Sequence, residues 1–253
     1  MVATETLFMC CTTILHCIFE ETPMIKVVLF DVDNTLLDFD QYVKDAMKNG
    51  FEKFGLGKYD DDTFAVFTKV NSALWHALER GELSFEELKK VRWNLVFEAL
   101  GISFDGVYFE NYFRDFLFDS AIPIEGAYDL LNSLKGKYIL GVASNGPYDQ
   151  QINRLKVSNM LDYFSHFFIS EEIGHSKPSL AFFDVCMERL NQNVQEKFEP
   201  SNVMIVGDSL SSDIAGGRQC GMKTCFFNPQ NKPVESGVCD FVVTKLCQLK
   251  EIL

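Results

Sequence analysis

The sequence predicts an α/β protein with a parallel sheet at its centre and an all-helical insertion. From residue 122 onward, short apolar runs of strand length alternate with segments of helical periodicity, which is typical of a parallel sheet covered by helices. Residues 39–120 show helical periodicity only. The chain has 253 residues, 47% of them hydrophobic, and is long enough for one large domain or two smaller ones. We therefore expect a Rossmann-like core domain interrupted by a helical one.

The first predicted strand is the apolar run at 27–30, and Asp31 and Asp33 follow it directly. Because strand side chains alternate, both carboxylates point to the same side while Val32 points away. In open α/β sheets, ligands bind at the carboxyl ends of the strands. A carboxylate pair there can supply a nucleophile, a proton carrier and ligands for a divalent cation. The alternative is an acidic loop that only ends the strand.

Four helices are predicted between residues 39 and 120. Apolar side chains recur at helical spacing from 39 to 54, from 67 to 78, after a capping box at 84–87 as far as Gly101, and from 108 to 116. Aromatic stripes at this spacing are more often core than ligand-binding. This segment is therefore expected to pack as a helical unit of its own.

The remaining elements follow in alternation. They are a helix at 126–134, a strand at 138–143, a helix at 148–157, a strand at 167–170, a helix at 179–191, a strand at 203–206, a helix at 212–220, and strands at 224–227 and 240–243.

Polar residues follow three further strands of this series. They are Ser144 with Asn145, Lys177 before Pro178, and Asp208 with Asp213 five residues later. Together with Asp31-x-Asp33, these four motifs resemble, in order and residue type, those of the haloacid dehalogenase-like (HAD) hydrolase superfamily. The resemblance covers residues 24–253. It implies that 24–38 and 121–253 form the hydrolase core and that 39–120 form a helical cap over the active site.

The resemblance also implies a Mg²⁺-dependent phosphomonoesterase that acts through an aspartyl-phosphate intermediate. Asp31 would be the nucleophile and Asp33 the general acid and base. An aspartate at position 33 indicates the phosphatase type, since dehalogenase members lack it. Asp31, the main-chain carbonyl of Asp33 and Asp208 would hold Mg²⁺.

The other motif residues have supporting roles in this interpretation. Ser144, Asn145 and Lys177 would bind the substrate phosphate, and Asp213 would orient metal-bound water or Lys177. Each has a plainer alternative: Ser144 as a turn residue, Lys177 as a solvated lysine and Asp213 as a charge at a helix N-terminus.

The predicted cap carries a second resemblance. Leu74-Trp75, Glu79-x-Gly81-x-Leu83, Leu88 and Arg92 are similar to bacterial 5′-nucleotidases that act on pyrimidine nucleoside monophosphates. The similarity implies that Trp75 stacks on a base and that Arg92 pairs with the substrate. The alternative is that Trp75 and Trp93 fill the cap core. Phosphatases of phosphoglycolate, sugar phosphates or acylneuraminate phosphate, and phosphomutases, fit the same motifs.

The composition limits the classes of binding partner that we expect. A formal charge of −13 argues against nucleic acid. The eight cysteines include no C-x-x-C pair, and we interpret them as reduced thiols of a cytoplasmic protein. The expected partner is a small phosphorylated metabolite, most simply a nucleoside monophosphate, bound by a monomer or homodimer.

Residues 1–23 are interpreted as an N-terminal extension outside the fold. Their apolar run at 7–19 has no preceding Lys or Arg, unlike a signal peptide. The run is also shorter than the ~20 residues that span a bilayer. We therefore expect no membrane partner; weak association of this run with a membrane surface is the alternative.

Overall fold

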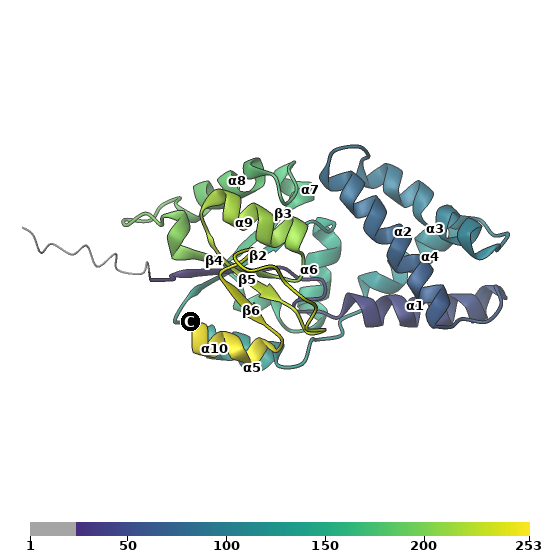
Figure 1. The fold of residues 1–253 in the computed structure, drawn as a ribbon, viewed down its shortest axis with the longest axis horizontal. Helices are drawn as coiled ribbons and strands as arrows, with labels where there is room; N and C mark the ends of the chain where they lie inside the picture. Colours follow the sequence, from purple (N-terminus) through teal and green to yellow (C-terminus); the bar gives the residue numbers. More distant parts are fainter. Residues whose placement is uncertain (1–23) are drawn as a thin grey trace, which may run out of the picture.

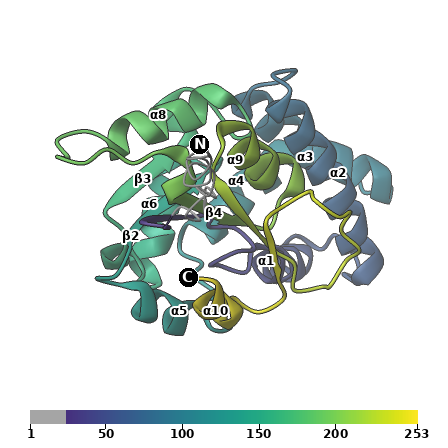
Figure 2. The ribbon, with the colours of Figure 1, turned by 60° about the vertical axis from the view of Figure 1, so that its left-hand side comes forward.

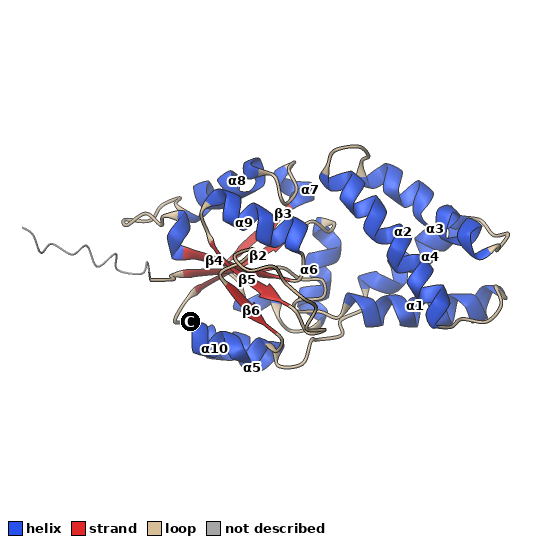
Figure 3. Ribbon diagram, in the orientation of Figure 1, coloured by secondary structure: helices blue, strands red, loops and turns tan. Residues whose placement is uncertain are grey.

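A computed structural model describes residues 24–253. Its centre is a six-stranded sheet in the order β3-β2-β1-β4-β5-β6, with every neighbouring pair parallel (Figure 3). The strands are β1 (Val27–Phe30), β2 (Ile139–Ser144), β3 (His166–Ile169), β4 (Val203–Gly207), β5 (Lys223–Phe227) and β6 (Phe241–Val243). The chain leaves β1 toward β2 on one side and later returns to form β4 on the other. The strand order therefore switches at β1, where ligands bind in such sheets.

Helices cover both faces of the sheet (Figures 1 and 2). One face packs against α5 (Ala127–Leu134), α6 (Tyr148–Val157) and α10 (Leu249–Ile252), the other against α8 (Leu180–Leu190) and α9 (Ala215–Cys220). The alternation along β1 explains this, because Val28 and Phe30 join the first core while Val27 and Leu29 join the second. The predicted Rossmann-like α/β class is confirmed.

The four helices predicted for residues 39–120 are present. They are α1 (Phe39–Phe54), α2 (Asp61–Glu79), α3 (Phe85–Leu100) and α4 (Gly106–Phe118), called here the helical insertion. They lie together beside the sheet and its covering helices (Figure 1). An aromatic core joins them, in which the fully buried Trp93 ring lies 4.4 Å from that of Phe109, centroid to centroid. Trp93 is therefore a packing residue.

Several element boundaries differ from the prediction. Helix α2 begins at Asp61, before the apolar stripe, because a capping box of Asp60 and Thr63 starts it. The helix predicted at 212–220 is divided into a π-helical turn, Leu210–Ile214, and α9. The single-turn helices α7 (Ser170–Ile173) and α10 were not predicted, because four residues are too few to show a helical period.

The interpretation of residues 1–23, with their apolar run, falls outside the described part of the chain. Between residues 24 and 253, no helix is both long and apolar enough to cross a bilayer. The five cysteines in that range are free thiols.

Candidate active site

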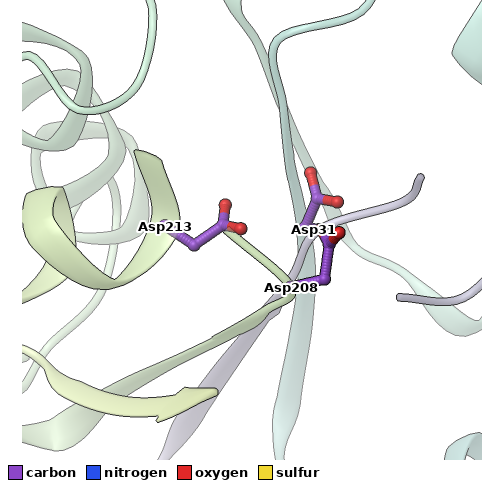
Figure 4. A group of neighbouring side chains, drawn as sticks. All are labelled: Asp31, Asp208 and Asp213. Atoms are coloured by element: carbon purple, nitrogen blue, oxygen red, sulfur yellow. The ribbon is translucent and has the colours of Figure 1, made fainter. Parts of the chain in front are cut away.

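Three aspartates come together at the carboxyl ends of the two central strands. Asp31 follows β1, Asp208 follows β4, and Asp213 lies in the π-helical turn after β4. Carboxylate oxygens of the three lie within 4.8 Å of one another. Figure 4 shows Asp31 beside Asp208, with Asp213 reaching toward them from its turn. Gly207 permits this approach, since a Cβ there would lie 2.1 Å from Oδ2 of Asp213.

A buried lysine joins two of these aspartates. Nζ of Lys177 donates to Oδ1 of Asp31 at 2.7 Å, to Oδ1 of Asp213 at 2.6 Å and to the carbonyl of Ala143 at 2.6 Å. Its main chain is fixed by the Asn145 side chain, which donates to its carbonyl at 2.9 Å and accepts from its amide at 2.8 Å. Asn145 thus positions Lys177 through its amide group, and Lys177 is not a solvated lysine.

Burial and mutual repulsion shift the acidity of this cluster. Burial raises the pKa of Asp31 to about 7; Lys177 opposes the rise, while Asp213 and Asp33 add to it. Burial also raises the pKa of Asp208 well above its usual value, and the charges of Asp31 and Asp213 raise it further. Burial lowers the pKa of Lys177, but Asp213 and Asp31 outweigh it and hold the ammonium charged. Three carboxylates for one bound ammonium leave a surplus of negative charge and of oxygen ligands.

Asp33 is held by two side chains of α6. Its Oδ1 accepts from Nη1 of Arg154 at 2.5 Å, and its Oδ2 accepts from Nε2 of Gln151 at 2.7 Å. Nε2 of Gln151 also donates to Oγ of Ser144 at 2.8 Å. Gly146 makes room for this contact, because a Cβ there would lie 2.5 Å from Nε2 of Gln151. Asp33 and Ser144 are therefore connected through one glutamine.

Arg154 also reaches the end of the helical insertion. The side chain is buried, and its Nε donates to the carbonyl of Ser120 at 3.2 Å, in the segment that follows α4. Neither Gln151 nor Arg154 was predicted as a site residue. The available signal was their spacing of three on the helix that directly follows Ser144 and Asn145, which places both on one helix face.

A cavity of about 220 Å³ lies between the sheet and the helical insertion, and every predicted site residue lines it. These residues are Asp31, Asp33, Ser144, Asn145, Lys177, Asp208, Asp213, Trp75 and Arg92. The residues implied by the hydrolase resemblance and those implied by the nucleotidase resemblance thus line the same cavity.

The two predicted cap residues differ in how they meet this cavity. Trp75 is half-buried beside Phe85, with ring centroids 5.8 Å apart, and both rings line the cavity. Arg92 is buried, and each of its three nitrogens donates within the protein: Nε and Nη2 to Glu110 at 3.0 and 2.6 Å, and Nη1 to Asn71 at 3.0 Å. An arginine bound in this way has little freedom to pair with a substrate.

Comparisons of the sequence and of the structure with known proteins lead to the same family. Residues 25–221 match the profile of the haloacid dehalogenase-like hydrolase family. The crystal structure of the HAD-hydrolase YfnB from Bacillus subtilis, bound to magnesium, has a TM-score of 0.80 and 32% identity, covering 91% of this chain and 99% of that one. The pyrimidine 5′-nucleotidase PynA from Streptococcus pneumoniae is 33% identical over 81% of this chain and 85% of that protein. The pyrimidine 5′-nucleotidase YjjG from Escherichia coli is 28% identical over 89% and 96%.

Proposed function

The chain belongs to the haloacid dehalogenase-like hydrolase family, and from this we propose that it is a Mg²⁺-dependent phosphatase of nucleoside 5′-monophosphates, with pyrimidine nucleotides preferred. One observation carries the phosphatase proposal. Asp31 and Asp33 emerge from β1 into one cavity, where Asp31 is bound by a buried lysine and Asp33 by a buried arginine. A nucleophile and a proton carrier are thus available side by side.

Asp31 is the proposed nucleophile. Its Oδ1 is bound to Lys177, and its other oxygen attacks the phosphorus of the substrate. The bond between phosphorus and the ester oxygen breaks, and Asp33 gives its proton to that leaving oxygen. Asp33 then takes a proton from water, whose oxygen attacks the aspartyl phosphate and releases inorganic phosphate. Asp31 is regenerated as a carboxylate, so the two steps balance.

Ser144 and Lys177 are the proposed phosphate ligands. Oγ of Ser144 accepts from Gly146 and Gln151, which leaves its own O–H to donate into the cavity. Lys177 brings positive charge beside Asp31, and Asn145 holds it there.

The acidic cluster fits a magnesium ion. Asp31 and Asp208, with the main-chain carbonyl of Asp33, offer the hard oxygen ligands that Mg²⁺ prefers, and Asp213 supports the group from the π-helical turn. A bound Mg²⁺ would neutralise the repulsion between these carboxylates and the phosphate. Burial is the main reason that the pKa values of Asp31 and Asp208 are raised, and neighbouring carboxylates add to it; a bound cation would favour the charged form of both groups.

The substrate class rests on the relatives and on the cavity. PynA and YjjG are pyrimidine 5′-nucleotidases. The rings of Trp75 and Phe85, tilted by 36° to each other, give the cavity an aromatic surface on which a base can stack. We accordingly propose that residues 39–120 form a cap domain and that 24–38 and 121–253 form the hydrolase core.

A phosphate-release screen tests this proposal. We expect uridine and thymidine monophosphates to exceed purine monophosphates, sugar phosphates and phosphoglycolate in kcat/KM. A base stacked on an aromatic ring contributes ~1–3 kcal/mol, or about 5- to 150-fold. If a sugar phosphate or phosphoglycolate is the best substrate, the nucleotidase proposal is wrong and the phosphatase proposal stands. Isomerisation of a sugar phosphate without phosphate release would instead indicate a phosphomutase.

Arg154→Met tests the positioning of Asp33. Losing the bond to Oδ1 should leave Asp33 poorly placed to protonate the leaving oxygen. We expect kcat for uridine monophosphate, whose alkoxide leaving group needs a proton, to fall about 10- to 100-fold. Hydrolysis of p-nitrophenyl phosphate, whose leaving group is stable without a proton, should fall much less. Steady-state rates on the two substrates give the comparison.

The matched control is Asn153→Ala on the same helix. It removes a 2.9 Å hydrogen bond from α6 to the carbonyl of Phe118 without a contact to Asp33. Equal losses on the two substrates in Arg154→Met would mean that Arg154 only stabilises the fold.

A further inference from the structure

Arg114 on α4 lines the cavity and carries a side-chain donor that has no partner in the described part of the protein. The half-buried side chain lines the same cavity as Asp31 and Lys177. Its Nε atom is buried, and no group among residues 24–253 accepts a hydrogen bond from it. Buried donors in proteins are nearly always paired. A cavity-lining guanidinium group that the protein leaves with an unpaired donor is therefore available to a ligand.

A second arginine, Arg92, lines the same cavity but has hydrogen-bond partners within the protein. Glu110 and Asn71 accept hydrogen bonds from its Nε, Nη1 and Nη2. The helical insertion thus contains one arginine that is fixed within the protein and another, Arg114, that has a free donor. Arg114 is the better candidate for a substrate contact.

The place of Arg114 determines which part of a substrate it can meet. Asp31, Ser144 and Lys177 form the wall contributed by the sheet and its loops, where the phosphate is expected. Arg114 lies on the opposite wall, contributed by the helical insertion, which also carries Trp75 and Phe85. A substrate whose phosphate reaches Asp31 presents its far end to this second wall.

We propose that Arg114 donates a hydrogen bond to a carbonyl oxygen on the planar ring of the substrate and so determines specificity. This inference rests on the proposed phosphatase function. A guanidinium group has donors only, so its partner must be an acceptor. The aromatic rings of Trp75 and Phe85, which line the same cavity, favour a flat group, and uracil and thymine carry ring carbonyl oxygens. A ring of the same shape without these oxygens would leave the donor unpaired, which is what makes such sites discriminate.

Arg114→Met is the first test, with uridine monophosphate and phenyl phosphate as substrates. Phenyl phosphate has a flat ring without a carbonyl. We expect kcat/KM for uridine monophosphate to fall about 10- to 100-fold, the effect of losing a hydrogen bond to a charged group. For phenyl phosphate it should stay within about twofold. Arg80→Met is the matched control, because this exposed arginine of the helical insertion pairs with Glu82 and does not line the cavity.

A second test leaves the protein unchanged. The wild-type chain is given thymidine monophosphate and its isostere with a difluorotoluene ring, which keeps the shape but accepts hydrogen bonds poorly. We expect the isostere to lose about 10- to 100-fold in kcat/KM, and Arg114→Met to treat the two nucleotides alike. Equal wild-type rates on the two nucleotides would overturn the inference even if Arg114→Met does not fold.

Three results would overturn the inference alone: equal losses of both substrates in Arg114→Met, a larger loss for phosphoglycolate than for uridine monophosphate, or equal wild-type rates on the nucleotide and its isostere. In each of them the phosphatase proposal survives, because the wild-type chain still releases phosphate. If the wild-type chain releases phosphate from neither uridine monophosphate nor phenyl phosphate, the proposed function fails and the inference fails with it.

Discussion

Asp31→Asn should lower kcat for phosphate-ester hydrolysis by several orders of magnitude while the protein stays folded. An amide has nearly the shape of a carboxylate but lacks the charge needed to attack phosphorus, so the first chemical step is lost. Lys177 would keep its bonds to Asp213 and to the carbonyl of Ala143, at 2.6 Å each, so the core around it remains connected. Phosphate release by the purified variant measures the loss of activity. Circular dichroism and thermal unfolding measure whether the variant stays folded.

The control for this change is Asp162→Asn, which removes an exposed carboxylate outside the cavity. It should leave kcat unchanged. Near-wild-type hydrolysis by Asp31→Asn, in a preparation free of other phosphatases, would contradict a mechanism through aspartyl phosphate. A variant that is inactive and also unfolded would not separate the two effects, so the unfolding midpoint is measured on the same sample.

The sequence predicted the sheet and the polar residues at its edge because both depend on local patterns. A strand such as β1 is a short apolar run, and the parallel arrangement places all carboxyl ends at one edge. That rule places Asp31, Ser144 and Asp208 at the same edge, although they are far apart in the chain. It does not make them neighbours: the resemblance to the HAD superfamily predicted that they form one site, and their proximity depends on β1 lying between β2 and β4.

The contacts between side chains could not be predicted in the same way. Arg154 binds Asp33 across 121 positions, and its spacing of three from Gln151 on α6 does not show that Asp33 is its partner. The same holds for the two arginines at the cavity: Arg92 is paired within the helical insertion and the Nε of Arg114 is not. Which guanidinium finds a partner depends on how α3 and α4 pack, and periodicity describes only which face of a helix is apolar.

Removing divalent cations should abolish turnover, and adding Mg²⁺ should restore it. Without a cation, the carboxylates of Asp31, Asp208 and Asp213 lie within 4.8 Å of one another and would repel a phosphate dianion. Mg²⁺ that binds the folded chain but not the unfolded one should also raise the unfolding temperature. A free Mg²⁺ concentration of about 100 times Kd stabilises the folded chain by ~2.7 kcal/mol. Phosphate release and thermal unfolding are measured after chelation and again across a Mg²⁺ titration.

Asp208→Asn separates the metal site from a general effect of Mg²⁺ on the protein. It removes a proposed ligand charge but keeps an oxygen, so more Mg²⁺ should be needed for half-maximal activity, and the thermal shift at a given concentration should shrink. Asp162→Asn, which removes the same charge from an exposed position, should respond to Mg²⁺ as the wild-type chain does. Full activity in metal-free buffer would exclude a required cation. An unchanged Mg²⁺ dependence in Asp208→Asn would remove Asp208 from the ligands, because a carboxylate that binds the ion cannot lose its charge without weakening that binding.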